Sequence, residues 1–171
     1  TTASKVAFGA IIESSFTVCS VTRYTGGAKS RILQGQGRNW YHGHHNGRAG
    51  VAYYEGWKTV ATNRVNPNTD WLVMCGANSG ANLKLANGVD VGTATGGMGG
   101  ASLRINAGDI GYETSAFAIA ELIVWRRGLT SAETCLVSES LLDSLKSSPP
   151  PLPPRVPPLP PDLPPWPPDS A

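Results

Sequence analysis

Three histidines stand close together in the stretch WYHGHHNGRAG, and imidazole is among the commonest metal ligands in proteins. If this stretch is extended, His42 and His44 share one face of the strand and His45 lies on the other. Two imidazoles placed two residues apart can bind zinc, but such a site needs a third ligand that the sequence does not offer. We therefore expect a polar strand edge or loop here, with Trp40 and Tyr41 packed at its flank, and no metal site.

Aromatic side chains in and after this stretch suggest a second kind of chemistry, the stacking of sugar rings on flat apolar surfaces. His, Asn and Arg side chains nearby would supply hydrogen bonds to sugar hydroxyls. Aromatic residues in strands more often belong to the core, so a packed core and a carbohydrate-binding surface both remain open. The candidates for carbohydrate binding are Trp40, Tyr53, Tyr54 and Trp57.

Charge and composition argue against several other classes of partner. The net charge is only +2, which gives no electrostatic case for nucleic acid or an anionic membrane. No run reaches the roughly 18 apolar residues of a membrane helix, so we expect no membrane span. The Gly-rich run TGGMGG lacks the Lys-Ser/Thr pair of a phosphate-binding loop, and no N-x-S/T acceptor for N-linked sugar occurs.

The three cysteines, Cys19, Cys75 and Cys135, match no zinc-binding spacing. Three buried thiols are one possibility. One disulfide plus an odd cysteine, as expected outside the cell, is the other, and we favour it because of the C-terminal tail described below. The sequence does not fix which two would pair. It starts at Thr1 rather than Met, and we expect a mature or excised segment without its targeting sequence.

The elements that must position these residues are many short strands. In SSFTVCSVTRY, a face with Phe16 and Val18 alternates with a face carrying Cys19 and Val21. Gly and Asn clusters separate such runs at spacings of roughly 8 to 12 residues, which is typical of an antiparallel sandwich or barrel. In LKLANGVDVG, the pair Asn87-Gly88 predicts a tight hairpin turn.

The run SAFAIAELIVW, residues 115–125, predicts a longer strand that is central in its sheet and at least partly covered on both faces. Thr130 and Glu133 then form a capping box, which predicts a helix near residues 130–146. The apolar residues at helical spacing are Leu136, Val137, Leu141 and Leu145. In the strand predicted over residues 115–125, one face would carry Phe117, Ile119, Glu121, Ile123 and Trp125, and the other Ala116, Ala118, Ala120, Leu122 and Val124.

The run FAIAELIVWRRGLTSAE resembles the closing strand and terminal helix of laminin-G-like domains, within the concanavalin A-like lectin/glucanase group. In laminin-G-like domains, the closing strand and the start of the helix have a sequence of the type F-x-G-x-I-A-E-V-x-V-(W/Y)-x-R-x-L-(S/T)-x-x-E. SFTVCSVTRY, DWLVMCGANSGANLKLANGVDVG and LRINAGDIGYETSAF resemble earlier strands of that family, in the same order. The resemblance covers roughly residues 5–146 and implies an all-β fold, an antiparallel jelly-roll β-sandwich with one C-terminal helix.

This resemblance also implies where ligands and catalysis could be. Laminin-G-like domains often bind calcium at a sandwich rim, and Asp90 and Asp109 are the candidates here, although no clustered Asp or Asn motif accompanies them. Some relatives of the fold hydrolyse glucans with carboxylates spaced as E-x-D-x-x-E on one strand. No such spacing occurs, so we expect no catalytic residues and no enzyme. We also expect no cofactor, calcium being the one candidate.

The C-terminal residues 148–171 have a composition that excludes them from the sandwich. Thirteen of the fourteen prolines fall here, and proline favours the extended polyproline II helix. Twenty such residues span roughly 60 Å. PPLPPRVPPLPP also fits an SH3 or WW ligand. The residues that we expect to be modified or to dock on other subunits are Pro149, Pro150, Pro151, Pro153, Pro154, Pro157, Pro158, Pro160, Pro161, Pro164, Pro165, Trp166, Pro167 and Pro168.

The tail composition resembles hydroxyproline-rich glycoproteins of algal and plant extracellular matrices, which join globular heads to hydroxylated, O-glycosylated rods. We therefore predict two domains, a sandwich over residues 1–147 and a tail over residues 148–171. The expected function is that of an extracellular structural glycoprotein subunit, a homo-oligomer whose tail docks on neighbouring subunits to build a filament or surface coat. The alternative is a carbohydrate-binding lectin module on a proline-rich stalk.

Overall fold

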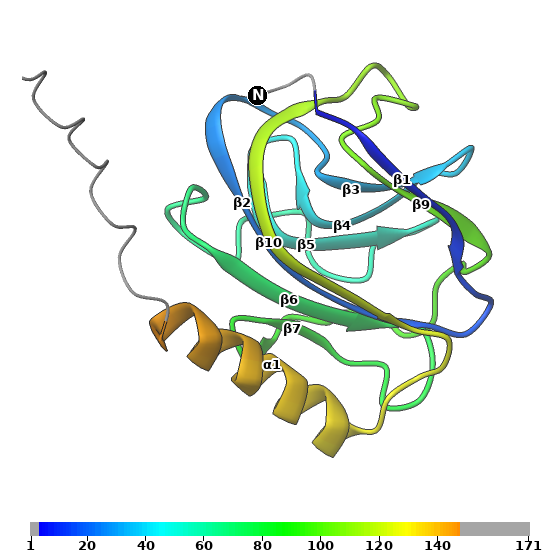
Figure 1. Cartoon of the computed structure of the whole chain (residues 1–171). Helices are drawn as coiled ribbons and strands as arrows, with labels where there is room; N and C mark the ends of the chain where they lie inside the picture. The colour runs from blue at the N-terminus through cyan, green and yellow to red at the C-terminus, as the bar shows by residue number, and fades with distance from the viewer. Residues whose placement is uncertain (1–3, 148–171) are drawn as a thin grey trace, which may run out of the picture.

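The computed structural model describes residues 4–147, which form a sandwich of two five-stranded antiparallel sheets with one C-terminal helix (Figure 1). The predicted all-β sandwich is therefore confirmed, while the predicted polyproline II tail lies outside the described residues. The first sheet has the strand order β1-β9-β3-β4-β5 and the second β10-β2-β6-β7-β8. None of the helices within residues 4–147 has the length and apolar character needed to cross a membrane.

The strands of the first sheet are β1 (Val6–Ile12), β9 (Ala101–Ile105), β3 (Leu33–Gln36), β4 (Trp40–His45) and β5 (Arg48–Tyr54). Those of the second are β10 (Ser115–Trp125), β2 (Thr17–Lys29), β6 (Leu72–Ala77), β7 (Lys84–Ala86) and β8 (Val89–Asp90). Between the sheets lies the main core, which contains Phe16, Leu33, Trp40, Tyr54 and Met74. The ten strands and the core described here lie within residues 4–147, and we expect this part of the chain to fold alone.

Strand β2 packs on both faces, and its residues alternate between them as the sequence pattern predicted. Phe16, just before it, and Val18 enter the core between the sheets. Cys19 and Val21 belong to a second cluster, between the second sheet and helix α1 (Ser131–Ser147). Figure 1 shows α1 lying below β6 and β7, on the outer side of this sheet. The helix therefore buries a sheet face that would otherwise be exposed to water.

Helix α1 begins with the predicted capping box. The Thr130 amide donates to Glu133 Oε2 over 2.8 Å, and the Glu133 amide donates to Thr130 Oγ1 over 3.3 Å. The expectation that Leu136 belongs to the apolar face is wrong, because this side chain is 67% exposed. Val137, Leu141, Leu142 and Leu145 pack on the sheet instead.

Strand β10 has the predicted bounds but not the predicted place. It is an edge strand, hydrogen-bonded only to β2 among the described strands. A shift in register between Ile119 and Glu121 also breaks the expected alternation. As a result Ile119, Leu122 and Val124 lie against the main core, while Ile123 and Trp125 pack with the helix.

One lateral side of the sandwich is closed by backbone hydrogen bonds. The Lys58 amide donates to Ala52 O over 3.0 Å, at the free side of β5, and the Thr93 amide donates to Lys58 O over 2.9 Å. Thr59 and Gly92 form an isolated bridge in the same place. The nearby β7–β8 hairpin has the predicted turn, with φ of 48° at Asn87 and 80° at Gly88. This side therefore joins the two sheets, whereas the side of β1 and β10 is not joined in this way.

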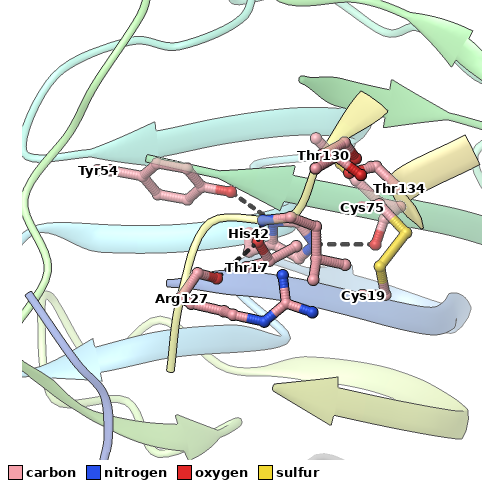
Figure 2. Close-up of a disulfide and its surroundings, with 10 residues drawn as sticks. Thr17, Cys19, His42, Tyr54, Cys75, Arg127, Thr130 and Thr134 are labelled. Carbon is pink, nitrogen blue, oxygen red and sulfur yellow. Dashed lines mark hydrogen bonds between the residues drawn. A yellow bond between two sulfur atoms is a disulfide. The ribbon is translucent and has the colours of Figure 1, made fainter. Parts of the chain in front are cut away.

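A disulfide links Cys19 and Cys75, which lie directly opposite each other on β2 and β6 (Figure 2). Both residues are fully buried under helix α1. Cys135 is a free, exposed thiol. The expectation of one disulfide plus an odd cysteine is confirmed, and the structure supplies the pairing.

Candidate functional site

The three histidines do not form a polar strand edge. Strand β4 lies between β3 and β5, and His42 and His44 are fully buried in the interior on one strand face, as the spacing predicted. His42 Nε2 lies 3.1 Å from Met74 O and therefore carries the proton, so Nδ1 accepts from the Tyr54 hydroxyl at 2.8 Å. His44 Nδ1 lies 3.2 Å from Thr22 Oγ1.

Burial keeps these two imidazoles neutral. It lowers the pKa of His42 to about 4 and that of His44 to about 3, from an ordinary value near 6.5. His45, on the outer face, lies 3.4 Å from Glu113 Oε1. Within residues 4–147 no group of three His, Cys, Asp or Glu side chains could hold a metal ion.

The four candidate sugar-stacking residues separate into two pairs. Trp40 and Tyr54 lie in the core between the sheets and stack on each other, with ring centroids 5.1 Å apart. They therefore do not contribute to a surface platform. Tyr53 and Trp57 lie on the outer side of the first sheet, and the Trp57 side chain is 36% exposed. A surface stacking site in this region is thus reduced to these two rings.

Tyr53 and Trp57 belong to what we call the outer aromatic cluster, together with Tyr41 and His45. The Tyr41 and Tyr53 rings stack with centroids 5.2 Å apart, and the Trp57 ring stands nearly perpendicular to Tyr53, at 89°. Burial raises the pKa of Tyr41 to about 12, so its hydroxyl stays protonated at neutral pH. The cluster lies on the outer face of the first sheet. Its most central ring, Tyr41, is buried and not accessible to solvent, so this ring could not stack on a sugar.

An arginine connects the outer aromatic cluster to the loop that precedes β10. The Arg31 guanidinium carbon lies 4.7 Å from the Tyr41 ring centroid, and Nη2 donates to Asn39 Oδ1 over 2.9 Å. Its Nε donates to Glu113. The sequence reasoning did not find Arg31 and Glu113, since they are 82 residues apart and no local pattern marks them.

The two calcium candidates are single carboxylates in separate places. Asp90 accepts a hydrogen bond from the Gly92 amide over 2.9 Å. Asp109 pairs with Arg104 over 3.1 Å. Within the described residues, neither belongs to a group of three His, Cys, Asp or Glu side chains that could hold a metal ion. The charge of Asp109 is already neutralised by Arg104.

A groove lies at the open lateral side of the sandwich, between the edge strands β1 and β10. It has a volume of about 320 Å³ and is lined by Phe8, Ile11, Leu122, Val124 and Arg126; we call it the open-edge groove. The Phe8 side chain is 41% exposed. The sequence reasoning did not find this site, because it treated β10 as a central strand with covered faces.

The proline residues proposed for modification or docking lie outside the described residues. Comparison of the chain with protein-family models and with curated proteins finds no match. The structural features above therefore carry the functional argument by themselves.

Proposed function

We propose that this chain is an extracellular structural glycoprotein subunit, in which a laminin-G-like sandwich head accepts the proline-rich tail of a neighbouring subunit. Repetition of this contact builds a fibril or surface coat. The observation that carries the proposal is the open-edge groove, where four apolar side chains and Arg126 line an exposed hollow, in a chain whose last 24 residues include 13 prolines. A contact between the tail of one copy and the head of the next is heterologous and need not close into a ring.

The extracellular location is supported by the disulfide. Cys19 and Cys75 are bonded and buried, and such bonds persist in oxidising compartments. In that setting SH3 and WW domains, which are intracellular, are not the partners of the tail. We propose instead that tail prolines are hydroxylated and carry O-linked glycans, which stiffen the tail and protect it from proteases.

A non-enzymatic role is supported by the state of the acidic side chains near the sheets. Glu113 is engaged with Arg31 and His45, and Asp109 with Arg104. Retaining and inverting glycosidases need two free carboxyl groups about 5 to 9 Å apart across a substrate site. We propose that this head binds and assembles rather than hydrolyses.

The test compares the full chain with a chain ending at residue 147, by sedimentation velocity and negative-stain electron microscopy. We expect the full chain to form filaments or large oligomers and the shortened chain to remain a monomer. Filaments formed equally well by the shortened chain would show that the tail is not the assembly element. On protein from the native source, intact-mass steps of about 16 Da and additional pentose or hexose would report hydroxylation and glycosylation.

A lectin is the second candidate function, and the exposure of Trp57 next to Tyr53 favours it. An indole and a phenol side by side offer apolar faces for sugar rings. A lectin would keep its glycan-array signal in the chain ending at residue 147 and lose it in Trp57→Ala. The core residue Trp40 is not a suitable control, because its replacement would damage folding; Tyr112→Ala, at an exposed loop residue, is the matched control.

A further inference from the structure

Resting on the proposed function, we propose that the open-edge groove is the receptor for the tail, and that it takes the segment around Leu163 and Trp166 from a neighbouring copy. Several observations lead to this assignment: the exposure of the groove, the edges of the strands that form it, the charge at its mouth and the place where the tail leaves the head. The proposal concerns the bare polypeptide, not a sugar or a lipid.

The groove exposes side chains that belong to the interior of a sandwich. Leu122 and Val124 pack against the main core and are only partly buried there. Phe8 lies within the register shift between Ala7 and Gly9 in the pairing of β1 with β9, and its side chain lines this opening. Val6, on the same strand, is 46% exposed. A further apolar segment would complete the burial of these side chains.

Strands β1 and β10 also present unpaired backbone edges. Each has a single neighbour among the described strands, β9 and β2 respectively. Exposed edges of this kind recruit further chains unless they are covered. A proline-rich segment suits this position, because its carbonyls accept hydrogen bonds from edge amides while proline has no amide to continue the ladder. Such an occupant covers the edge without starting sheet-like aggregation.

The tail carries apolar side chains suited to this groove. In a polyproline II helix with three residues per turn, Leu163 and Trp166 lie on one edge, and the flanking proline rings add apolar surface. Recognition of such helices depends on apolar grooves that receive side chains at this repeat. A groove with the volume given above accommodates a few such side chains rather than the whole tail.

Charge favours one register of the segment. Arg126 lines the groove, is 70% exposed and lies 3.7 Å from Glu13, so its guanidinium remains available to a second acid. In the tail, Asp162 stands directly before Leu163. If Leu163 enters the groove, Asp162 comes within reach of Arg126. The tail carries two acids, Asp162 and Asp169, and one base, Arg155, so its net charge opposes that of Arg126.

The stiffness of the tail favours a neighbouring copy over the same copy. Helix α1, which is about 25 Å long given its 17 residues, separates the end of β10 from the start of the tail. The prolines begin two residues after the helix and resist the sharp reversal that a return would need. We therefore infer that the groove receives the tail of a neighbouring copy rather than its own.

The experiment measures binding of a fluorescent, unmodified peptide of residues 149–169 to the chain ending at residue 147, by fluorescence anisotropy. We expect saturable binding, weakened about tenfold in Phe8→Ala. Arg126→Glu is expected to weaken binding roughly threefold to fivefold, and a peptide with Asp162→Arg to recover it. Leu136→Ala, which removes an exposed apolar side chain on α1, is the matched control and should bind as the parent chain does.

Unsaturable binding, or equal binding to the parent chain and Phe8→Ala, would overturn the assignment of the groove. Phe8 is well exposed, so the fold should survive its replacement, and thermal unfolding checks this; Arg126→Glu is an independent variant. If full-length Phe8→Ala still assembles in a tail-dependent way, the groove assignment fails but the proposed function stands. If the shortened chain polymerises like the full chain, the proposed function fails. A third outcome is that the shortened chain binds no peptide but forms dimers that Phe8→Ala abolishes. The occupant of the groove would then be a second head, and the assignment to the tail would fail.

Discussion

The Tyr54 hydroxyl lies 2.8 Å from His42 Nδ1, inside the core, and joins the neighbouring strands β5 and β4 by a side-chain hydrogen bond (Figure 2). On the opposite side of the imidazole, Nε2 donates to Met74 O on β6, in the second sheet. His42 thus connects the two sheets through one ring. Because it is buried, this connection works only while the imidazole is neutral.

The buried histidines predict that the protein loses stability in acid. The folded-state pKa values of His42 and His44, about 4 and about 3, lie below the unfolded value near 6.5. The unfolded state therefore binds more protons below pH 6.5, and stability falls as the pH decreases. Between pH 7 and pH 5 we expect a loss of about 2 kcal/mol for each histidine, measured by urea unfolding.

A glutamine at position 44 keeps polarity but cannot be protonated, so His44→Gln should reduce this pH dependence by about half. His45→Gln is the matched control, because His45 is only partly buried, and Glu113 beside it opposes the lowering of its pKa by burial. An unchanged slope in His44→Gln would contradict the assignment of acid sensitivity to the buried pair.

Gly76 should not tolerate a side chain, because a Cβ there would overlap the Tyr54 hydroxyl and contact the His42 ring. We expect Gly76→Ala to destabilise the fold by about 2 to 3 kcal/mol in chemical denaturation. Tyr54→Phe removes the overlapping atom, so the double variant should cost less than the sum of the single variants. Gly27→Ala is the control, since nothing lies within 4 Å of its Cβ position. Strictly additive costs would argue against this contact.

Removal of the disulfide should cost stability without changing the fold. The bond between Cys19 and Cys75 closes a loop with a sequence separation of 56. From the entropy of the unfolded chain, Cys19→Ala with Cys75→Ala should lower the free energy of unfolding by about 4 kcal/mol. Cys135→Ala should have almost no effect, because this thiol is free and exposed. Peptide mapping without reduction should find Cys135 alone alkylated; alkylation of Cys19 would be inconsistent with the pairing.

Thr17 fastens the start of β2 to the chain between β10 and α1. Its hydroxyl donates to Arg127 O and accepts from the Leu129 amide, both over 3.0 Å. Thr17→Val keeps the shape but leaves both backbone groups unpaired, so we expect a loss of about 1 to 3 kcal/mol in thermal or chemical unfolding. Thr17→Ser retains the hydroxyl and should recover most of it. Equal losses in the two variants would show that packing of the methyl group, not the hydrogen bonds, is what matters.

If the tail docks in the open-edge groove, its glycans should be unevenly distributed. Pro164 and Pro165, between Leu163 and Trp166, would be covered and should carry no sugar, because a groove of about 320 Å³ cannot accept glycosylated residues. Pro149 to Pro154 would remain accessible and modified. Glycopeptide mapping of native protein measures this directly, and uniform occupancy along the tail would contradict the docking model.

Local signals in the sequence predicted local structure well. The capping box at Thr130 and Glu133 marks the start of α1, and Asn87-Gly88 marks the β7–β8 turn, because both depend on a few adjacent residues. The alternating pattern of β2 likewise predicted which of its residues share a face, and the structure places Val18 and Cys19 on opposite faces. These features are determined by hydrogen bonds and side-chain alternation within one segment.

Features that depend on distant pairing were not predictable in the same way. The bulge near Glu121 and the edge position of β10 arise from how it aligns with β2, and alternation alone does not reveal either. The burial of His42 depends on Tyr54 and Met74, which come from two other strands. The open-edge groove likewise needs β1 and β10 to come together from opposite ends of the sandwich chain.

The position of the disulfide has a mechanical consequence for a subunit that is pulled through its tail. Tension would enter through α1 and reach β10, whose pairing with β2 runs along most of its length. If β10 were torn away, the 56-residue span closed by Cys19 and Cys75 could not be drawn out. About 190 Å of extension would thus be withheld, and once the chain after Cys75 had been drawn out the load would pass to a covalent bond.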